Sequence, residues 1–158
     1  IKNAIQIMMN GTEQDFISYI DTFKSEFNSL PPEDIAFPRS VNGLRKYKGQ
    51  TTVYTKGCPL HVRGTLLYNF YIAKNSLEYK YPLVQEGEKI KYIFLRRGNP
   101  IHENVLSFLN TFPKELGLEG CIDRDMQFKK SFLDPLQVIS NVIGWETEKK
   151  VTLDFLFV

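Results

Sequence analysis

The sequence predicts an α+β fold that is mainly helical and carries a small β-sheet or hairpin. Three segments carry this prediction: an amphipathic helical stripe over residues 16–30, a proline-led helical segment at 59–75, and the β-prone run KIKYIFLR at 89–96. The chain has 158 residues, of which 42% are hydrophobic. A chain of this length buries roughly 69% of its unfolded surface, so the composition predicts a packed core and excludes a disordered protein.

Two helices are predicted in the first thirty residues. The first covers residues 1–9 and stops at Asn10-Gly11. Thr12 then has the character of an N-cap, with Asp15 three residues later forming a capping box. The second helix places its large apolar residues at steps of four and three and ends at Pro31-Pro32; these residues are Phe16, Ile20, Phe23, Phe27 and Leu30. We expect this stripe to face the core.

The middle of the chain alternates irregular and regular segments. Residues 33–57 are expected to be irregular, with one short strand at 51–55. A helix is predicted to begin with Pro59 as its first residue and to run to about Asn75. Gly64 lies inside it, where glycine costs about 1 kcal/mol relative to alanine. This position therefore indicates the close approach of another backbone or of a ligand.

From residue 89 onward, the sequence predicts a strand, a turn, a short apolar run and then helices. The strand at 89–96 is followed by a turn at 98–100 and by a short apolar run at 104–109, which could be helix or strand. A helix is expected around 123–133, with a new start at Pro135 and a stop at Gly144.

Charge is unevenly distributed along the chain, although the net charge is only +2. Residues 1–34 sum to −4, residues 35–77 to +7 and residues 78–158 to −1. The central block contains no carboxylate at all. A basic patch inside a nearly neutral protein is typical of a surface that contacts a polyanion.

The candidate metal ligands are too few for a zinc site. Cys58 and His61 have C-x-x-H spacing, but the other cysteine and histidine, Cys121 and His102, form no second tight pair. Two cysteines also exclude a disulfide scaffold. The sequence therefore predicts no metal site.

Other motifs do not establish catalysis in this chain. Asp123 and Asp125 open a predicted helix, where acidic residues serve as caps more often than as metal ligands. No phosphate-binding loop and no G-x-S-x-G motif is present. The sequence assigns no catalytic residue, and a small hydrolase built on Cys58 and His61 stays open as an alternative.

The C-terminal end is unusually apolar for a terminus. The charged stretch ETEKK is followed by VTLDFLFV. This arrangement favours a tether whose apolar tip binds a groove on a partner. The predicted contact residues are Leu153, Asp154, Phe155, Leu156 and Phe157.

Four blocks resemble one known family. They are TKGCPLHVRGTLLYN at 55–69, EGEKIKYIFLRRGNP at 86–100, FKKSFLDPL at 128–136 and EKKVTLDFLF at 148–157. Together they are similar to the C-terminal thumb of the replicative family B DNA polymerases of T-even-type bacteriophages. The resemblance covers nearly the whole chain in unbroken order.

This resemblance implies a thumb domain at 1–148 and a clamp-binding tail at 149–158. The implied partners are primer-template duplex DNA, the sliding clamp and the remainder of the polymerase, including its palm, with no membrane. The parent would be a Mg²⁺-dependent nucleotidyltransferase in the cytoplasm of an infected bacterium. The family's D-x-x-S-L-Y-P and D-T-D-S motifs are missing here, so the resemblance implies a fragment without cofactor or activity of its own.

The resemblance also implies a set of DNA contacts. His61 and Arg63 would lie at the duplex with Gly64 beside them, and Lys130 would face the primer strand. The sequence departs from the family at three lysine positions, which are Gly57, Asn104 and Asp134. Neighbouring cations are candidates to compensate. The full predicted DNA-binding set is Lys56, His61, Arg63, Gly64, Arg96, Arg97, Lys129 and Lys130.

A second alternative is a stand-alone nucleic-acid-binding adaptor. The first residue is Ile1 rather than methionine, and we expect a piece of a larger protein instead.

Overall fold

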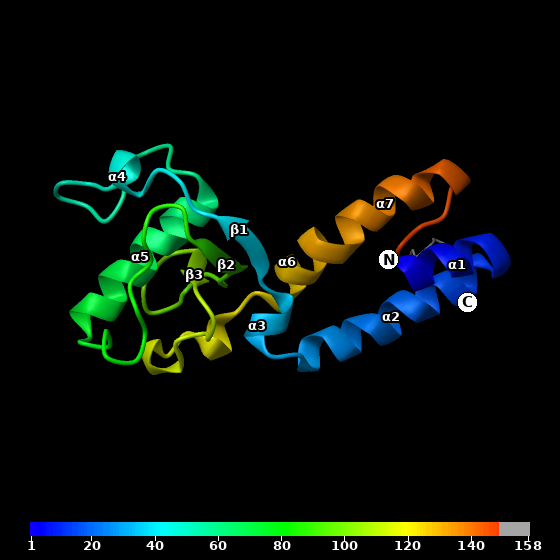
Figure 1. Ribbon diagram of the computed structural model, residues 1–158. Helices are drawn as coiled ribbons and strands as arrows, with labels where there is room; N and C mark the ends of the chain where they lie inside the picture. The colour runs from blue at the N-terminus through cyan, green and yellow to red at the C-terminus, as the bar shows by residue number, and fades with distance from the viewer. Residues whose placement is uncertain (149–158) are drawn as a thin grey trace. The chain divides into compact units, whose positions relative to one another are not determined.

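The structure is a computed structural model that describes residues 1–148 (Figure 1). It divides into two compact units. Of the described residues, one unit contains 1–30 and 128–148, and the other contains 31–127. The mainly helical α+β class is confirmed, since the helices are accompanied by one three-stranded antiparallel sheet.

The first unit begins with the two predicted helices. They are α1 at Lys2–Asn10 and α2 at Glu13–Ser29. The capping box is present, because the Thr12 hydroxyl accepts from the Asp15 backbone N–H at 3.2 Å and the Asp15 carboxylate accepts from the Thr12 N–H at 3.1 Å. Both helix predictions are confirmed to within one residue at these ends.

The later helices run on without the predicted new start at Pro135. They are α6 at Arg124–Phe128, the π-helical η3 at Lys129–Leu133, α7 at Asp134–Ser140 and the 3₁₀ turn η4 at Asn141–Ile143. The Asp134 N–H bonds to the Lys129 carbonyl, five residues back. This wider turn accommodates the proline, which lacks an N–H and would crowd a regular α-helical turn. The predicted stop is confirmed, because Gly144 ends η4 with φ of +73°.

An aromatic cluster forms the core of this unit. The Phe23 ring lies 4.7 Å from Phe132 and 5.9 Å from Phe128, and Phe27 meets Phe128 at 5.2 Å. At the other end of α2, Phe16 is fully buried and lies 5.5 Å from Trp145. The apolar stripe on α2 therefore faces a core, as predicted, except for Leu30, which is exposed.

The second unit is built around the sheet. Its strands are β1 at Phe37–Ser40, β2 at Lys89–Phe94 and β3 at Val105–Phe108, with β2 in the centre. Both pairs are antiparallel, with Arg39 opposite Ile90 and Lys91 opposite Phe108. The strand predicted at 89–96 is confirmed but two residues shorter. The undetermined run at 104–109 is a strand.

The interpretation of residues 33–57 is partly wrong. The expected strand at 51–55 is absent, because only Tyr54 in this stretch pairs, in an isolated bridge with Lys48. The segment instead contains β1 and two short helices, α3 at Pro32–Ile35 and α4 at Leu44–Tyr47. Strand β1 is short and contains Pro38, which is tolerated because β1 is an edge strand.

Helix α5 at Leu60–Lys74 packs against β3, as the green segments of Figure 1 show. Pro59 is its N-cap rather than its first residue. The predicted close approach at Gly64 is confirmed and is made by backbone. A Cβ added at Gly64 would lie 2.6 Å from the Ser107 hydroxyl oxygen and 3.0 Å from the Ser107 backbone nitrogen.

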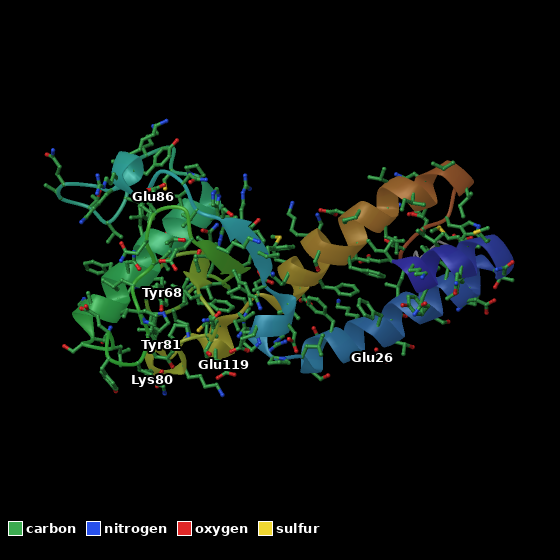
Figure 2. The ribbon with its side chains drawn as sticks, in the orientation of Figure 1. Glu26, Tyr68, Lys80, Tyr81, Glu86 and Glu119 are labelled. Carbon is green, nitrogen blue, oxygen red and sulfur yellow. The ribbon has the colours of Figure 1, made fainter. Side chains whose placement is uncertain are left out.

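A polar cluster joins the segment after α5 to the 3₁₀ turn η1 at Lys114–Leu116. The Glu115 carboxylate accepts hydrogen bonds from the Lys80 ammonium and from the Tyr81 hydroxyl. The Lys80 bond, followed by the Tyr81 bond, lowers the pKa of Glu115 to about 2. Lys80 and Tyr81 are labelled side by side in Figure 2.

We expect this cluster to make the stability of the second unit sensitive to acid. A depressed carboxyl pKa stabilises the fold above the ordinary value near 4.5, and this contribution is lost as the pH falls toward about 2. Thermal unfolding of the chain and of Glu115→Gln at several pH values tests this. The difference between them should shrink from pH 5 to pH 2. A difference that stays constant over this range would contradict it.

Candidate nucleic-acid interface

The part of the acid-free block around α4 is largely exposed and projects from the second unit (Figure 1). We call residues 42–56 the basic tip; it contains α4 and the loop that follows. Its cations Arg45, Lys46, Lys48 and Lys56 are all exposed. Several cations without a neighbouring acid on one projection are suited to contact the phosphates of a nucleic acid.

The basic tip is anchored at its start and is bonded to itself near its far end. The two carboxylate oxygens of Glu86 accept the backbone N–H groups of Gly43 and Leu44, at 2.6 and 3.0 Å, and so cap the start of α4 (Figure 2). At the far end, the Thr55 N–H bonds to the Tyr47 carbonyl at 2.8 Å. The tip is therefore an ordered loop, and the Glu86 carboxylate that anchors it is already engaged with backbone N–H groups.

Lys56 occupies the corner of an exposed turn. The Cys58 N–H bonds to the Thr55 carbonyl at 3.3 Å, which places Lys56 and Gly57 at the two central positions. Gly57 has φ of +83°, a conformation that favours glycine. The turn therefore explains the glycine at position 57, and the ammonium of Lys56 is presented to solvent beside it.

Arg63 is half-buried and is engaged with neighbouring side chains of the second unit. Its guanidinium donates to the Asn104 side chain at 2.6 Å and lies 5.6 Å from the centre of the Tyr54 ring. Tyr54 in turn donates its hydroxyl to Glu103 at 2.7 Å. The Nε atom of Arg63 is buried and makes no hydrogen bond within the described residues. Sequence reasoning missed this cluster, because its members are far apart in the chain.

His61 is a poor candidate for a cationic DNA contact. Its side chain is 8% exposed, and its ring centre lies 6.4 Å from that of Tyr92. Burial, helped by the charge of Arg39, lowers the pKa of His61. A buried neutral imidazole contributes packing rather than charge. Gly64 is likewise buried against β3, so its place in the sequence is explained by strand packing.

The remaining candidates lie in two places. Arg96 and Arg97 are exposed near the turn at Gly98, and Arg96 also donates to the Gly120 carbonyl. Lys129 and Lys130 belong to the first unit and contact the Asp134 carboxylate at 3.2 and 3.7 Å. All three side chains are about half exposed, and such surface pairs are weak. The predicted set is therefore divided between the two units.

The Cys58 and His61 pair does not form a nucleophile and base. The Cys58 thiol contacts the Pro59 carbonyl at 3.6 Å, and burial raises its pKa, which keeps it protonated at neutral pH. Neither residue lines the pocket described below. Nothing in this geometry favours the hydrolase alternative.

The described residues also lack a cluster of side chains that could bind a metal ion. Across residues 1–148, no three His, Cys, Asp or Glu side chains gather in a way that could hold a metal ion. Asp123 acts as the predicted cap, since its carboxylate accepts the Met126 N–H at 2.9 Å.

Two further sequence predictions concern the end of the chain and the membrane. The predicted tail at 149–158, with Leu153, Asp154, Phe155, Leu156 and Phe157, lies outside the described residues. None of the helices in residues 1–148 has both the length and the apolar character needed to cross a membrane.

Comparison with known proteins confirms the resemblance to phage DNA polymerases. The chain is 29% identical over 161 residues to the DNA-directed DNA polymerase of Enterobacteria phage T4, and 30% identical over 162 residues to that of Escherichia phage RB69. Each alignment covers 99% of this chain and 17% of the polymerase. The chain thus spans about a sixth of the length of these relatives. No family model matches it.

Proposed function

We propose that this chain is the thumb of a family B DNA polymerase, which holds primer-template duplex DNA through backbone contacts and tethers the enzyme to its sliding clamp. The observation that carries the proposal is the similarity to two phage DNA polymerases over 99% of the chain. The parent enzyme is then a Mg²⁺-dependent nucleotidyltransferase, and the fragment is inactive alone because it supplies no catalytic residue.

The basic tip supports the duplex-binding part of this proposal. Lysine and arginine contacts to phosphates hold DNA without reading its sequence, which a copying enzyme requires. Lys56 and the cations of α4 are exposed and lie on an ordered projection without a free carboxylate. We assign the main phosphate contacts of the second unit to these residues, and we give Arg63 a positioning role through Tyr54 and Asn104.

An exposed aliphatic stripe supports the placement of this chain inside a larger polymerase. Val138 and Val142 are 71% and 85% exposed, one helical turn apart on α7 and η4, and Ile139 and Ile143 beside them are 39% and 46% exposed. Adjacent exposed aliphatic side chains of this kind mark an interaction surface. We assign this stripe to contacts with the remainder of the polymerase.

Duplex DNA binding by the 158-residue chain tests the proposal. We expect weak binding without sequence preference. The logarithm of the association constant should fall by about 0.9 per logarithmic unit of salt concentration for each phosphate neutralised. Fluorescence anisotropy on several unrelated duplexes at 20–200 mM salt measures both properties. Binding that ignores salt, or no binding at the lowest salt, would refute the proposal.

Paired charge variants sharpen this test. Lys56→Gln should weaken binding to all duplexes alike and lower the salt slope by about 1. Asp134→Asn should strengthen binding, because it releases Lys129 and Lys130 from their carboxylate partner. Asp21→Asn removes the same charge from α2 and serves as the control. Equal effects of Asp134→Asn and Asp21→Asn would show that only net charge matters.

A further inference from the structure

A pocket in the second unit lies beside the basic tip and has an apolar floor that the proposed duplex contacts do not use. Its volume is about 710 Å³, within the range of ligand-binding pockets. Its floor is the face of α5 that carries Leu66, Phe70 and Ala73, and its apolar lining continues with Leu83 and Val53.

The two walls of the pocket are fixed by hydrogen bonds. One wall is the basic tip, which Glu86 anchors through its bonds to Gly43 and Leu44. The other wall is the segment at residues 83–86. The Asn69 side chain holds it by donating to the Val84 carbonyl at 3.1 Å and accepting from the Val84 N–H at 2.8 Å. These bonds preform the pocket before any ligand arrives.

The floor presents an aromatic ring to solvent. Phe70 is 42% exposed and packs edge-to-face on Tyr71 at 5.0 Å. The Lys74 ammonium lies 5.7 Å from the centre of the Phe70 ring. A large apolar side chain placed on Phe70 would therefore meet both an aromatic surface and a nearby positive charge.

The charge around the pocket is positive. Arg45 and Lys48 line it, and the one acidic lining residue is Glu86, whose carboxylate already accepts two backbone N–H groups. Lys74 adds a further cation beside the floor. A ligand that complements this pocket carries negative charge next to large apolar groups.

We propose that this pocket binds a short acidic peptide, with aromatic or aliphatic side chains, from a partner protein. The apolar side chains would occupy the floor on α5, and the carboxylates would meet Arg45 and Lys48. Duplex DNA satisfies the charge but not the floor, because its outer surface is sugar and phosphate without apolar side chains. The proposal is independent of the polymerase assignment.

A designed peptide tests the site directly. The probe is a fluorescein-labelled octapeptide of alternating aspartate and phenylalanine, titrated with the 158-residue chain and followed by anisotropy. We expect saturable binding. A peptide with lysine in place of aspartate, and one with alanine in place of phenylalanine, should each bind at least about tenfold more weakly, a difference of about 1.4 kcal/mol. Equal binding of all three peptides would overturn the proposal.

Variants locate the binding. Phe70→Ala removes the exposed ring at a position where alanine favours helix, and the double variant Arg45→Gln/Lys48→Gln removes the rim charges from the surface without touching the core. Each should weaken the aspartate-phenylalanine peptide about tenfold or more. Lys114→Gln, which removes a cation away from the pocket, should leave the affinity unchanged. Circular dichroism melting confirms that each variant is folded.

Competition separates the peptide from the duplex. Because Arg45 and Lys48 lie on the rim of the pocket and in the basic tip, duplex DNA should displace the peptide only in part, whereas Phe70→Ala should leave duplex binding unchanged. If duplex DNA displaces the peptide stoichiometrically and Phe70→Ala weakens both, the pocket belongs to the duplex surface and the peptide proposal fails. If Arg45→Gln/Lys48→Gln and Lys114→Gln have the same effect on the peptide, the binding is diffuse electrostatic attraction and the proposal also fails.

Discussion

Replacing Gly64 by alanine is expected to destabilise the chain by about 1–3 kcal/mol, the usual cost of forcing an extra methyl group into a packed core. On helix propensity alone the same change would stabilise α5 by about 1 kcal/mol. Packing decides whether the substitution raises or lowers the free energy of unfolding. The added Cβ would lie 2.6 Å from the Ser107 hydroxyl oxygen, 3.0 Å from the Ser107 backbone nitrogen and 3.2 Å from the Leu106 carbonyl carbon.

The strand cannot easily move away from this methyl group. The Ser107 hydroxyl donates to the His61 carbonyl at 3.1 Å, so rotating it would break a buried hydrogen bond. The other two contacts are backbone atoms of β3, which is paired with β2 through Ser107 and Leu106. Both α5 and β3 would have to separate to accommodate the change.

Denaturant or thermal unfolding measures this effect. Gly120→Ala is the matched control, because nothing lies within 4 Å of the added methyl group and its backbone has no positive φ. A double variant, Gly64→Ala/Ser107→Ala, should recover part of the loss, since it removes the shortest contact but leaves the two backbone contacts. An unchanged or higher stability of Gly64→Ala would mean that α5 does not rest on β3 as described.

Gly64 also shows what could and could not be predicted from the sequence. A glycine inside a strong helix predicts close approach, but the sequence does not distinguish a strand from a ligand, because the contacting residue is 43 positions away. Helices α1, α2 and α5 were predictable from periodicity and caps, which are local signals. Strand β1 was not, since its four residues with a proline become a strand only by pairing with β2.

The candidate interface was also only partly predictable from the sequence. The absence of acids over 43 residues predicted a basic surface patch, but not that four of its cations would be exposed at residues 42–56. It could not predict that Asn104 accepts from Arg63, since this contact joins residues 41 positions apart. The pairing of Asp134 with Lys130 is a local i,i+4 contact, and sequence reasoning missed it. Asn104 and Asp134 thus bear on neighbouring cations, and Gly57 serves a turn.

Removing residues 153–158 is expected to abolish binding to the cognate sliding clamp while leaving the melting temperature nearly unchanged. Burying three or four large apolar side chains gives a gross gain of roughly 5–10 kcal/mol. Ordering a peptide and associating with a partner offset much of this gain, so we expect micromolar affinity. A contact of that strength holds the polymerase near the primer end by effective concentration and can still be released.

The contacts of the described residues explain why stability should survive the truncation. The apolar stripe on α2 meets Phe128, Phe132 and Trp145, all of which precede the removed segment. Calorimetry with purified clamp and thermal unfolding of the same samples measure the two expectations together. Removal of Val158 alone is the control and should change neither property.

The two measurements also separate the two roles that an apolar terminus can have. If truncation lowers the melting temperature by many degrees, the four apolar residues complete the core of the first unit, and the tether proposal fails. If stability and clamp binding are both unchanged, the clamp contact lies elsewhere on the polymerase. Only loss of binding with an intact fold assigns Leu153, Phe155, Leu156 and Phe157 to the partner, because a core residue cannot be removed without a cost in unfolding free energy.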